Sequence, residues 1–214
     1  MTESINLVCP LCSGLSAFFA ESRGRDYYKC QNCHGVFMDR AQLPGPAEEE
    51  GRYREHNNQV DDPRYQDFVR PIVSAVLADF SAAQQGLDFG AGTAPVITKM
   101  LRDAGYHIRS YDPYFQNFPQ LLTEHYDYIA CCEVAEHFYQ PAREFGVLKG
   151  LLNPGGGLYC MTVLYDETLY FEDWYYKNDQ THVFFYHAQS IEWIKVHFGF
   201  QSFEIKGRLI TLRA

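Results

Sequence analysis

The sequence predicts an α/β protein with a mostly parallel sheet, preceded by a small cysteine-rich module. From Gly86 onward, short apolar runs alternate with segments of helical periodicity, which is typical of a parallel sheet with helices on both faces. A glycine turn follows the first of these runs, as in nucleotide-binding α/β proteins. Two Cys-x-x-Cys pairs lie ahead of this pattern and indicate a separate module.

Residues 1–42 are predicted to form a zinc ribbon. Cys9 and Cys12 form one pair, Cys30 and Cys33 form the other, and 17 residues separate the pairs. Two thiolates on each of two tight turns complete a tetrahedral site with no open position, so the zinc is expected to be structural. So small a module has little core of its own and depends on the metal to fold. The alternative is a pair of redox-active dithiols, although such motifs usually have a single pair beside a βαβ unit.

The composition limits the class of function. A chain of 214 residues is long enough for one α/β domain and a small module. Its formal charge of −9 argues against a general nucleic-acid binder, which needs a basic surface. No apolar run is long enough to span a membrane and the start lacks a signal-peptide pattern, so we expect a cytoplasmic protein. Cys131, Cys132 and Cys160 lie in apolar strand-like segments, which agrees with a reducing compartment.

Residues 43–60 are predicted to be a linker or lid segment, because they begin with a Pro- and Gly-rich stretch and continue with three glutamates. The main domain is then predicted to span 61–214. It begins with a helix from Pro63 to about Phe80, whose apolar residues recur at helical spacing. Pro71 is expected to bend or restart this helix.

The main domain is predicted to alternate strands with helices and to end in an antiparallel hairpin. A ligand then belongs at the carboxyl ends of the strands. Strands are expected at 86–89, 106–111, 127–132 and 157–163, helices at 94–104, 137–151 and 188–197, and the hairpin at 200–205 and 208–213.

The turn from Leu87 to Pro95 carries most of the functional prediction. Gly90 and Gly92 permit positive φ and leave no side chain between the backbone and a ligand. The amides that open the following helix point to the same place. Asp112 ends the next predicted strand, where a carboxylate can accept hydrogen bonds from both ribose hydroxyls of a nucleoside. The alternative is that Asp112 caps the turn before Pro113.

The residues around the turn favour one class of cofactor. A nicotinamide dinucleotide fingerprint requires a third glycine in the helix, and residues 93–96 contain none. With Asp88 two positions before the first glycine, the segment resembles motif I of the class I S-adenosylmethionine-dependent methyltransferases. It departs from that family at Ala94 and Pro95, where a further glycine is common. The resemblance implies a Rossmann-like methyltransferase sheet and S-adenosylmethionine (SAM) as cofactor, bound by Asp88, Gly90, Ala91, Gly92, Asp112 and Glu133.

Further segments are similar to the same family. Residues 126–138 resemble its fourth strand and 151–156 resemble the turn before its fifth, whereas 113–126 is too short and polar for its third strand and helix. The sheet is therefore expected to lack an edge strand. With the cysteine module, the chain is similar to a bacterial group of methyltransferase-domain proteins that carry an N-terminal zinc ribbon. The motifs matched to that group are Tyr53-x-x-His56-Asn57, Tyr111-Asp112-Pro113, Glu133-x-x-Glu136-His137 and Asp179-x-Thr181-His182-Val183.

A second metal site is one interpretation of the third motif. Glu133, Glu136 and His137 are three and four residues apart, so they share a face of a helical turn, and His182 can supply a fourth ligand for a divalent ion. A similar set binds a metal in small-RNA 3′-end methyltransferases. In other members of the class the same residue types line the cofactor pocket without a metal, and both interpretations stay open here.

The segment from Tyr165 to His182 is rich in aromatic residues and is expected to form a lid or substrate wall. Phe171 and Trp174 are predicted to pack on the sheet. His182 is predicted to be the catalytic base, followed by His137 and, more weakly, His56, because an imidazole can take a proton from a hydroxyl or amine. A structural, hydrogen-bonded histidine is the alternative for His182.

Together these patterns predict SAM-dependent methyl transfer to an unidentified small-molecule acceptor, with no membrane partner. One alternative is an RNA- or protein-directed methyltransferase that uses the ribbon for recognition, because the ribbon contains a modest basic spot at Arg23, Arg25, Lys29 and Arg40. The other alternative is a non-catalytic binding module that keeps the fold.

Overall fold

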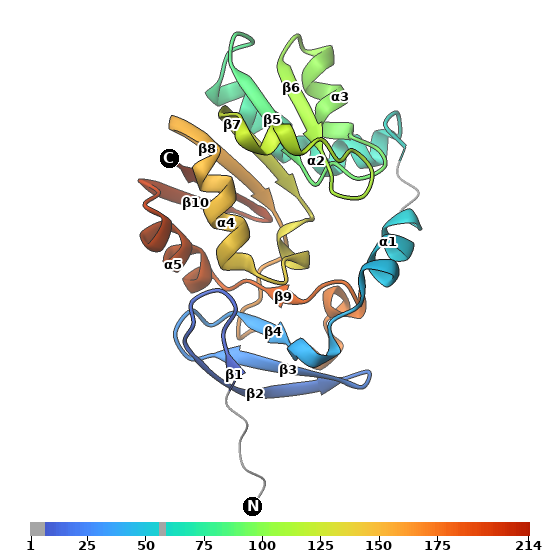
Figure 1. The fold of residues 1–214 in the computed structure, drawn as a ribbon, viewed down its shortest axis with the longest axis vertical. Helices are drawn as coiled ribbons and strands as arrows, with labels where there is room; N and C mark the ends of the chain where they lie inside the picture. Colours follow the sequence, from blue (N-terminus) through green and yellow to red (C-terminus); the bar gives the residue numbers. More distant parts are fainter. Residues whose placement is uncertain (1–6, 56–58) are drawn as a thin grey trace, which may run out of the picture.

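The computed structural model of the chain describes residues 7–55 and 59–214. Two sheets form its framework, a small one near the N-terminus and a larger one flanked by helices (Figure 1). Within these described ranges, no helix is both long and apolar enough to cross a membrane.

The small sheet joins the cysteine module to the main domain. Its strand order is β1-β2-β3-β4-β9, and every neighbouring pair is antiparallel. The fifth strand comes from the main domain and pairs with Val36 and Phe37, so it lies beside β4 in Figure 1. The strands are β1 (Leu7–Val8), β2 (Leu15–Ser22), β3 (Arg25–Cys30), β4 (Val36–Met38) and β9 (Phe184–Phe185).

The large sheet is mixed, as the sequence predicts. Its strand order is β10-β11-β8-β7-β5-β6, with a parallel part from β8 to β6 and an antiparallel C-terminal hairpin. The strands are β5 (Gln85–Phe89), β6 (His107–Tyr111), β7 (Tyr126–Cys132), β8 (Leu152–Met161), β10 (Ser202–Lys206) and β11 (Leu209–Arg213). In the described chain, β6 is an edge of the sheet. The segment after it forms an isolated bridge between Asp112 and Gln116 and a 3₁₀ helix, η2 (Pro119–Thr123), but no strand, which confirms the predicted loss of an edge strand.

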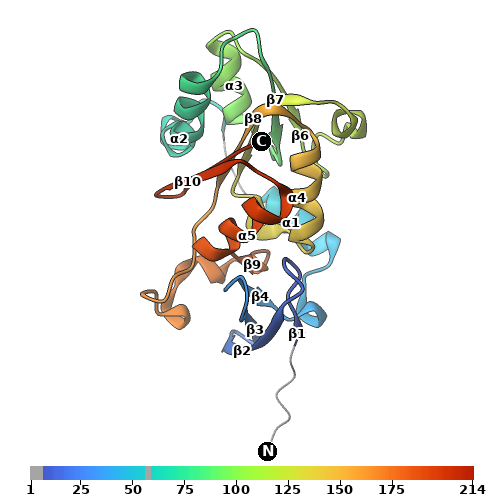
Figure 2. The same cartoon turned by 90° about the vertical axis from the view of Figure 1, so that its left-hand side faces the viewer.

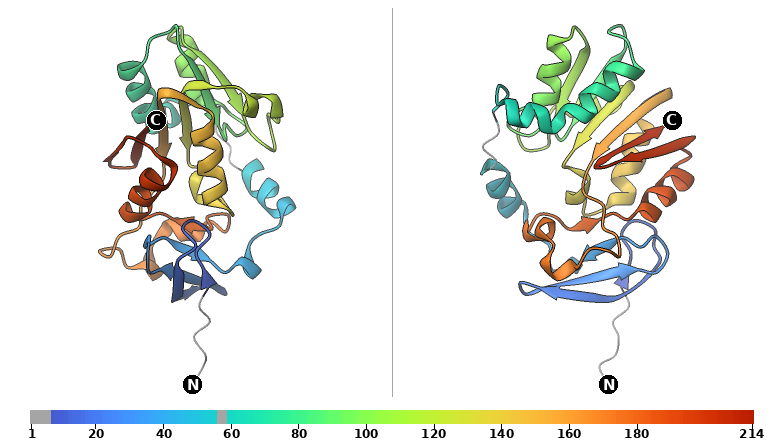
Figure 3. Two further views of the ribbon diagram at one scale, coloured as in Figure 1. Left: turned by 60° about the vertical axis from the view of Figure 1, so that its left-hand side comes forward. Right: turned by 180° about the vertical axis from the view of Figure 1, so that it is seen from behind.

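Helices cover both faces of the large sheet (Figures 2 and 3). On one face, α2 (Pro63–Asp79) and α3 (Val96–Asp103) enclose an apolar cluster that includes Tyr128. On the other face, α4 (Pro141–Gly150) and α5 (Ala188–Phe198) enclose a second cluster that includes Ile129. Neighbouring residues of β7 thus point to opposite faces, as a strand requires.

Three predicted segments differ from the structure. The helix α2 does not restart at Pro71, because its buried face of Val69, Ile72, Val73 and Val76 packs on the sheet and outweighs one missing hydrogen bond. The helix expected from residue 137 begins at Pro141, which favours the first helical position; a 3₁₀ turn, η3 (Ala135–His137), precedes it. The expected linker contains a helix, α1 (Pro46–Arg54), where the Glu48 side chain accepts from the Gly45 amide at 2.8 Å.

Candidate functional site

A cavity of about 1000 Å³ opens at the carboxyl ends of the parallel strands β5, β6 and β7. Its walls come from the turns after these strands, from α1, and from the segment between β8 and β9. We call the part lined by Gly90, Gly92 and Asp112 the glycine end. The part lined by His137 and His182 is the histidine end.

The glycine end is a turn held by hydrogen bonds. The Gly90 amide donates to the Tyr111 carbonyl at 2.8 Å, and the Gly92 amide donates to Oδ2 of Asp112 at 2.9 Å. The other oxygen of Asp112 accepts from the amides of Tyr114 and Phe115, so this carboxylate both lines the cavity and fixes two loops. Both predicted roles of Asp112, ligand contact and turn cap, are therefore compatible with its position.

Asp88 does not line the cavity. Its carboxylate accepts from the Thr98 hydroxyl at 2.8 Å and from the Thr98 amide at 3.2 Å, which ties β5 to α3. Burial raises the pKa of this carboxyl to about 6, although the Thr98 hydrogen bonds oppose that rise. Asp88 therefore supports the turn from beneath, whereas Ala91 and Glu133 line the cavity. The cofactor role of Asp88, near the methionine ammonium or its water shell, stays a prediction.

The helix α1 closes one side of the cavity, within the segment predicted as a linker or lid; Glu49 and Arg52 were not among the predicted site residues. Glu49 is buried and accepts from the hydroxyls of Tyr53 at 3.1 Å and Tyr114 at 2.9 Å. Arg52 pairs with Asp179 at 2.8 Å across the cavity wall. The spacing of Glu49, Arg52 and Tyr53 is a helical face, and that spacing is the signal that could have identified them.

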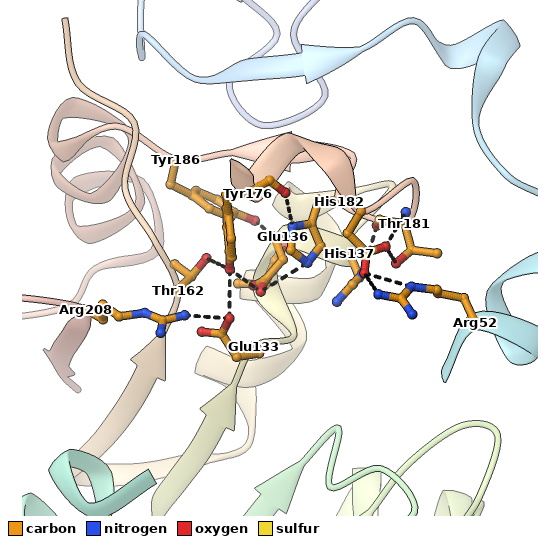
Figure 4. A network of polar contacts seen from close by, with 12 residues as sticks. Arg52, Glu133, Glu136, His137, Thr162, Tyr176, Thr181, His182, Tyr186 and Arg208 are labelled. Carbon is orange, nitrogen blue, oxygen red and sulfur yellow. Dashed lines mark hydrogen bonds and ion pairs between the residues drawn. The ribbon is translucent and has the colours of Figure 1, made fainter. Parts of the chain in front are cut away.

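The histidine end brings together residues from two distant segments (Figure 4). Glu136, His137 and His182 present one ligand atom each, all within 4.8 Å of one another. Nδ1 of His137 lies 2.8 Å from the Thr181 carbonyl, and Nδ1 of His182 lies 2.7 Å from the Tyr176 carbonyl. Burial lowers the pKa of His137, so its imidazole is held neutral.

Two acidic side chains belong to this end of the cavity, Glu136 within the cluster and Glu133 beside it. Burial is the main cause that raises the pKa of Glu133 to about 8 and that of Glu136 to about 7. Glu133 pairs with Arg208 at 2.7 Å, and its backbone has a φ of 52°, uncommon for a residue other than glycine. The Tyr176 hydroxyl donates toward both carboxylates. Arg208 comes from the C-terminal hairpin, and no local sequence signal could have placed it here.

The aromatic segment before His182 divides into two parts. Phe171 and Trp174 are buried, as predicted, but they pack with Tyr27 and Phe185 of the small sheet instead of on the large one. Tyr175 and Tyr176 line the cavity, as a substrate wall would. His56, the weaker base candidate, lies outside the described residues together with Asn57.

The four predicted cysteine ligands meet at one point of the small sheet. Their sulfurs lie within 4.8 Å of one another, with Cys9 and Cys33 at 3.6 Å and Cys12 and Cys30 at 3.3 Å. Thiolates bound tetrahedrally at 2.3 Å from zinc sit about 3.8 Å apart, so this cluster fits a zinc-binding ribbon.

Comparison with known families decides what the main domain is. Residues 61–204 match the methyltransferase domain family. The chain belongs to this family. A comparison with the curated proteins finds no match to this sequence.

Solved structures show the same methyltransferase fold. An O-methyltransferase family protein from Burkholderia thailandensis has a TM-score of 0.55 and 16% identity, over 81% of this chain and 64% of that one. Human N-acetylserotonin methyltransferase in complex with SAM has a TM-score of 0.51 and 14% identity, over 70% of this chain and 53% of that one. This methyltransferase chain thus spans under two thirds of the length of either structure.

The glycine end is open to a ligand. A Cβ added to Gly92 would meet no atom within 4 Å, so the turn is open to a ligand. Asp112 and the Gly90–Gly92 segment line the same space, where the Asp112 carboxylate can accept hydrogen bonds from a ribose.

Proposed function

We propose that this methyltransferase-domain protein transfers the methyl group of SAM to a hydroxyl of a small molecule. The observation that carries the proposal is one continuous cavity of about 1000 Å³, which both the glycine end and the histidine end line. A cofactor at one end and an acceptor at the other would be aligned in one cavity, and such alignment is the main contribution a methyltransferase makes to the rate.

We assign SAM to the glycine end. Gly90, Ala91 and Gly92 would approach its amino-acid part through backbone alone, Asp112 would accept from its ribose, and Glu133 would lie near its sulfonium. Asp88 would support the turn from beneath through its bond to Thr98. In the reaction, an acceptor oxygen forms a bond to the methyl carbon while the carbon–sulfur bond breaks, and its electron pair stays on sulfur as S-adenosylhomocysteine.

The acceptor is assigned to the histidine end. A hydroxyl must lose its proton before or during methyl transfer, and we propose that His182, with His137, promotes this loss. Tyr175 and Tyr176 would form an aromatic wall for the acceptor, and the Arg52–Asp179 pair would narrow the entrance from α1.

Two basic residues of the ribbon are bonded to the main domain, and this favours a small acceptor over RNA or protein. Lys29 pairs with Glu167 at 2.7 Å, and Arg25 donates to Gln180 at 3.2 Å, so both are directed at the main domain. A basic side chain that is bonded within the protein contributes less to the binding of nucleic-acid phosphates than one that faces solvent. We propose that the ribbon, with zinc at Cys9, Cys12, Cys30 and Cys33, supports the lid instead of recognising a polymer.

Titration calorimetry tests the cofactor assignment. We expect one SAM per chain with a micromolar Kd, competition by S-adenosylhomocysteine, and no binding of a nicotinamide dinucleotide, because the turn lacks a third glycine. Absence of SAM binding at millimolar concentration would contradict the enzyme proposal and leave a non-catalytic module.

The acceptor class is tested by following radiolabelled methyl groups from SAM. We expect label in small hydroxylated compounds, with S-adenosylhomocysteine released in equal amount. Label that enters only RNA or protein fractions would refute the small-molecule assignment while leaving the cofactor assignment intact.

A further inference from the structure

The histidine end is built like a metal centre as well as a proton-handling site. We infer that Glu136, His137 and His182 bind one divalent transition-metal ion there, separate from the cysteine site. The role of this ion in methyl transfer rests on the proposed function, whereas its binding does not. Glu133 lies beside the cluster on the same cavity wall.

The first argument is convergence. One carboxylate oxygen and two imidazole nitrogens approach within 4.8 Å, and Nε2 of His182 lies 3.9 Å from Oε1 of Glu136. That separation is too long for a hydrogen bond. Ligand atoms around a zinc-sized ion sit about 3.0–3.5 Å apart, so small side-chain rotations would complete the site. A single catalytic base needs no such group of three.

The second argument is the orientation of both imidazoles. The carbonyls of Thr181 and Tyr176 can only accept, so the Nδ1 atom of each histidine carries the proton and donates. Nε2 then holds the lone pair in both rings, and in His182 it faces Oε1 of Glu136 at 3.9 Å (Figure 4). An Nδ1–H bonded to a backbone carbonyl is the usual way in which a protein orients a metal-binding histidine.

The third argument is a deficit of positive charge and donors. Glu136 is fully buried, yet its Oε2 has no hydrogen-bond partner among the described residues, and neither has Oε1 of Glu133. The Tyr176 hydroxyl has only one proton for two carboxylates, and Arg208 reaches only Glu133. A buried acceptor without a donor costs about 1–3 kcal/mol, which a bound cation would remove.

A second group of the same composition lacks these properties. His34, Glu167 and His187 also approach one another, but the Glu167 side chain is 57% exposed. Nδ1 of His187 accepts from the Gln189 amide at 3.1 Å, so its Nε2 carries the proton and donates to Glu167. This arrangement is an ion-pair cluster, and it provides a matched control.

The donor set indicates the class of ion and its use. Two imidazoles and a carboxylate suit Zn²⁺, Co²⁺, Fe²⁺ or Mn²⁺, and three protein ligands leave positions open to water and substrate. An acceptor hydroxyl bound there would release its proton to water at neutral pH, and its oxygen would then attack the methyl group as already described. The two histidines would thus promote proton loss as ligands.

Cobalt titration of the full-length, zinc-loaded protein tests the inference. We expect one Co²⁺ to bind with a Kd of about 10 μM or tighter, giving visible d–d bands. The ultraviolet thiolate-to-cobalt band, which would report exchange at the cysteines, should stay absent. His137→Ala and His182→Ala should each weaken this binding at least about tenfold, whereas His34→Ala and His187→Ala should not. Retained zinc content and retained SAM binding show that each variant is folded.

The outcomes separate the two proposals. No Co²⁺ binding at millimolar concentration, or binding that survives His137→Ala and His182→Ala, would overturn the metal site. Full turnover by protein whose only metal is the ribbon zinc would overturn the ion's catalytic role and leave methyl transfer standing. Co²⁺ binding without any SAM binding would support the site and contradict the proposed function.

Discussion

The two ends of the cavity are held by different parts of the molecule. At the glycine end, the fixing contacts come from neighbouring elements: Asp112 bonds to Gly92, and Asp88 bonds to Thr98. At the histidine end, the backbone of Val183 links two distant segments. Its amide donates to the Glu136 carbonyl at 2.9 Å, and its carbonyl accepts from Met38 of the ribbon at 2.9 Å.

This difference implies that cofactor binding and turnover depend on different regions. Strand β4 of the ribbon pairs with β9 of the main domain, and the Ser190 hydroxyl donates to the Cys33 carbonyl at 2.8 Å. The cysteine site therefore supports β9, the strand that follows His182. The large sheet carries the glycine end without that support. Loss of the ribbon should therefore affect the acceptor side far more than the cofactor side.

The largest expected effect comes from breaking the cysteine site. Cys30→Ser should release zinc and unfold the ribbon, because so small a module has no adequate core without its metal. We expect turnover to fall more than about 100-fold while the Kd for SAM changes less than about fivefold. Zinc content, SAM calorimetry and methyl transfer measure the three quantities.

Asn32→Ser is the control, since Asn32 is exposed on the same turn and its side chain binds no sulfur. It should keep zinc, SAM affinity and turnover. If Cys30→Ser lost SAM binding in parallel with turnover, the two ends would not be supported separately.

Smaller effects are expected from alanine substitutions of the two glycines of the turn, one mainly on stability and the other mainly on SAM affinity. Gly90 has a φ of 76° and an added Cβ would lie 2.4 Å from Val134, so Gly90→Ala should cost about 3 kcal/mol of unfolding free energy through strain and overlap. Gly92 has a φ of 63° but open space around it, so Gly92→Ala should cost only about 1 kcal/mol. Its methyl group would instead project into the cavity and raise the Kd for SAM about tenfold or more.

Urea unfolding and calorimetry on both glycine variants check this division. Equal loss of stability in the two variants would contradict the geometry of the turn. Unchanged SAM affinity in Gly92→Ala would show that the cofactor does not approach this backbone.

The same division explains what the sequence could predict. The strand–turn–helix unit and the Cys-x-x-Cys pairs depend on short spacings, so the large sheet, the glycine turn and the cysteine cluster were predictable from local pattern. Arg208 reaches the cavity only through the tertiary fold, and no local spacing identifies it. The helical spacing of Glu49 indicates a shared face but does not show that this face lines the cavity. Asp88 shows the limit within a motif, because spacing placed it at the turn but could not show that Thr98 turns it away from the cavity.

The smallest expected effect tests the position of Asp88 through pH. Its pKa of about 6 in the folded protein lies above the usual 3.8, so the folded state binds more protons between these values and this contribution to stability falls as the pH rises. Asp88→Asn keeps an oxygen for Thr98 but cannot ionise. The unfolding free energy of wild type minus that of Asp88→Asn should therefore fall by about 2 kcal/mol from pH 4.5 to pH 7.

Asp103→Asn, an exposed change on α3, is the control and should show no such trend. A difference independent of pH would mean that Asp88 is not buried as described. A large loss of SAM affinity in Asp88→Asn would mean that this carboxylate interacts with the cofactor.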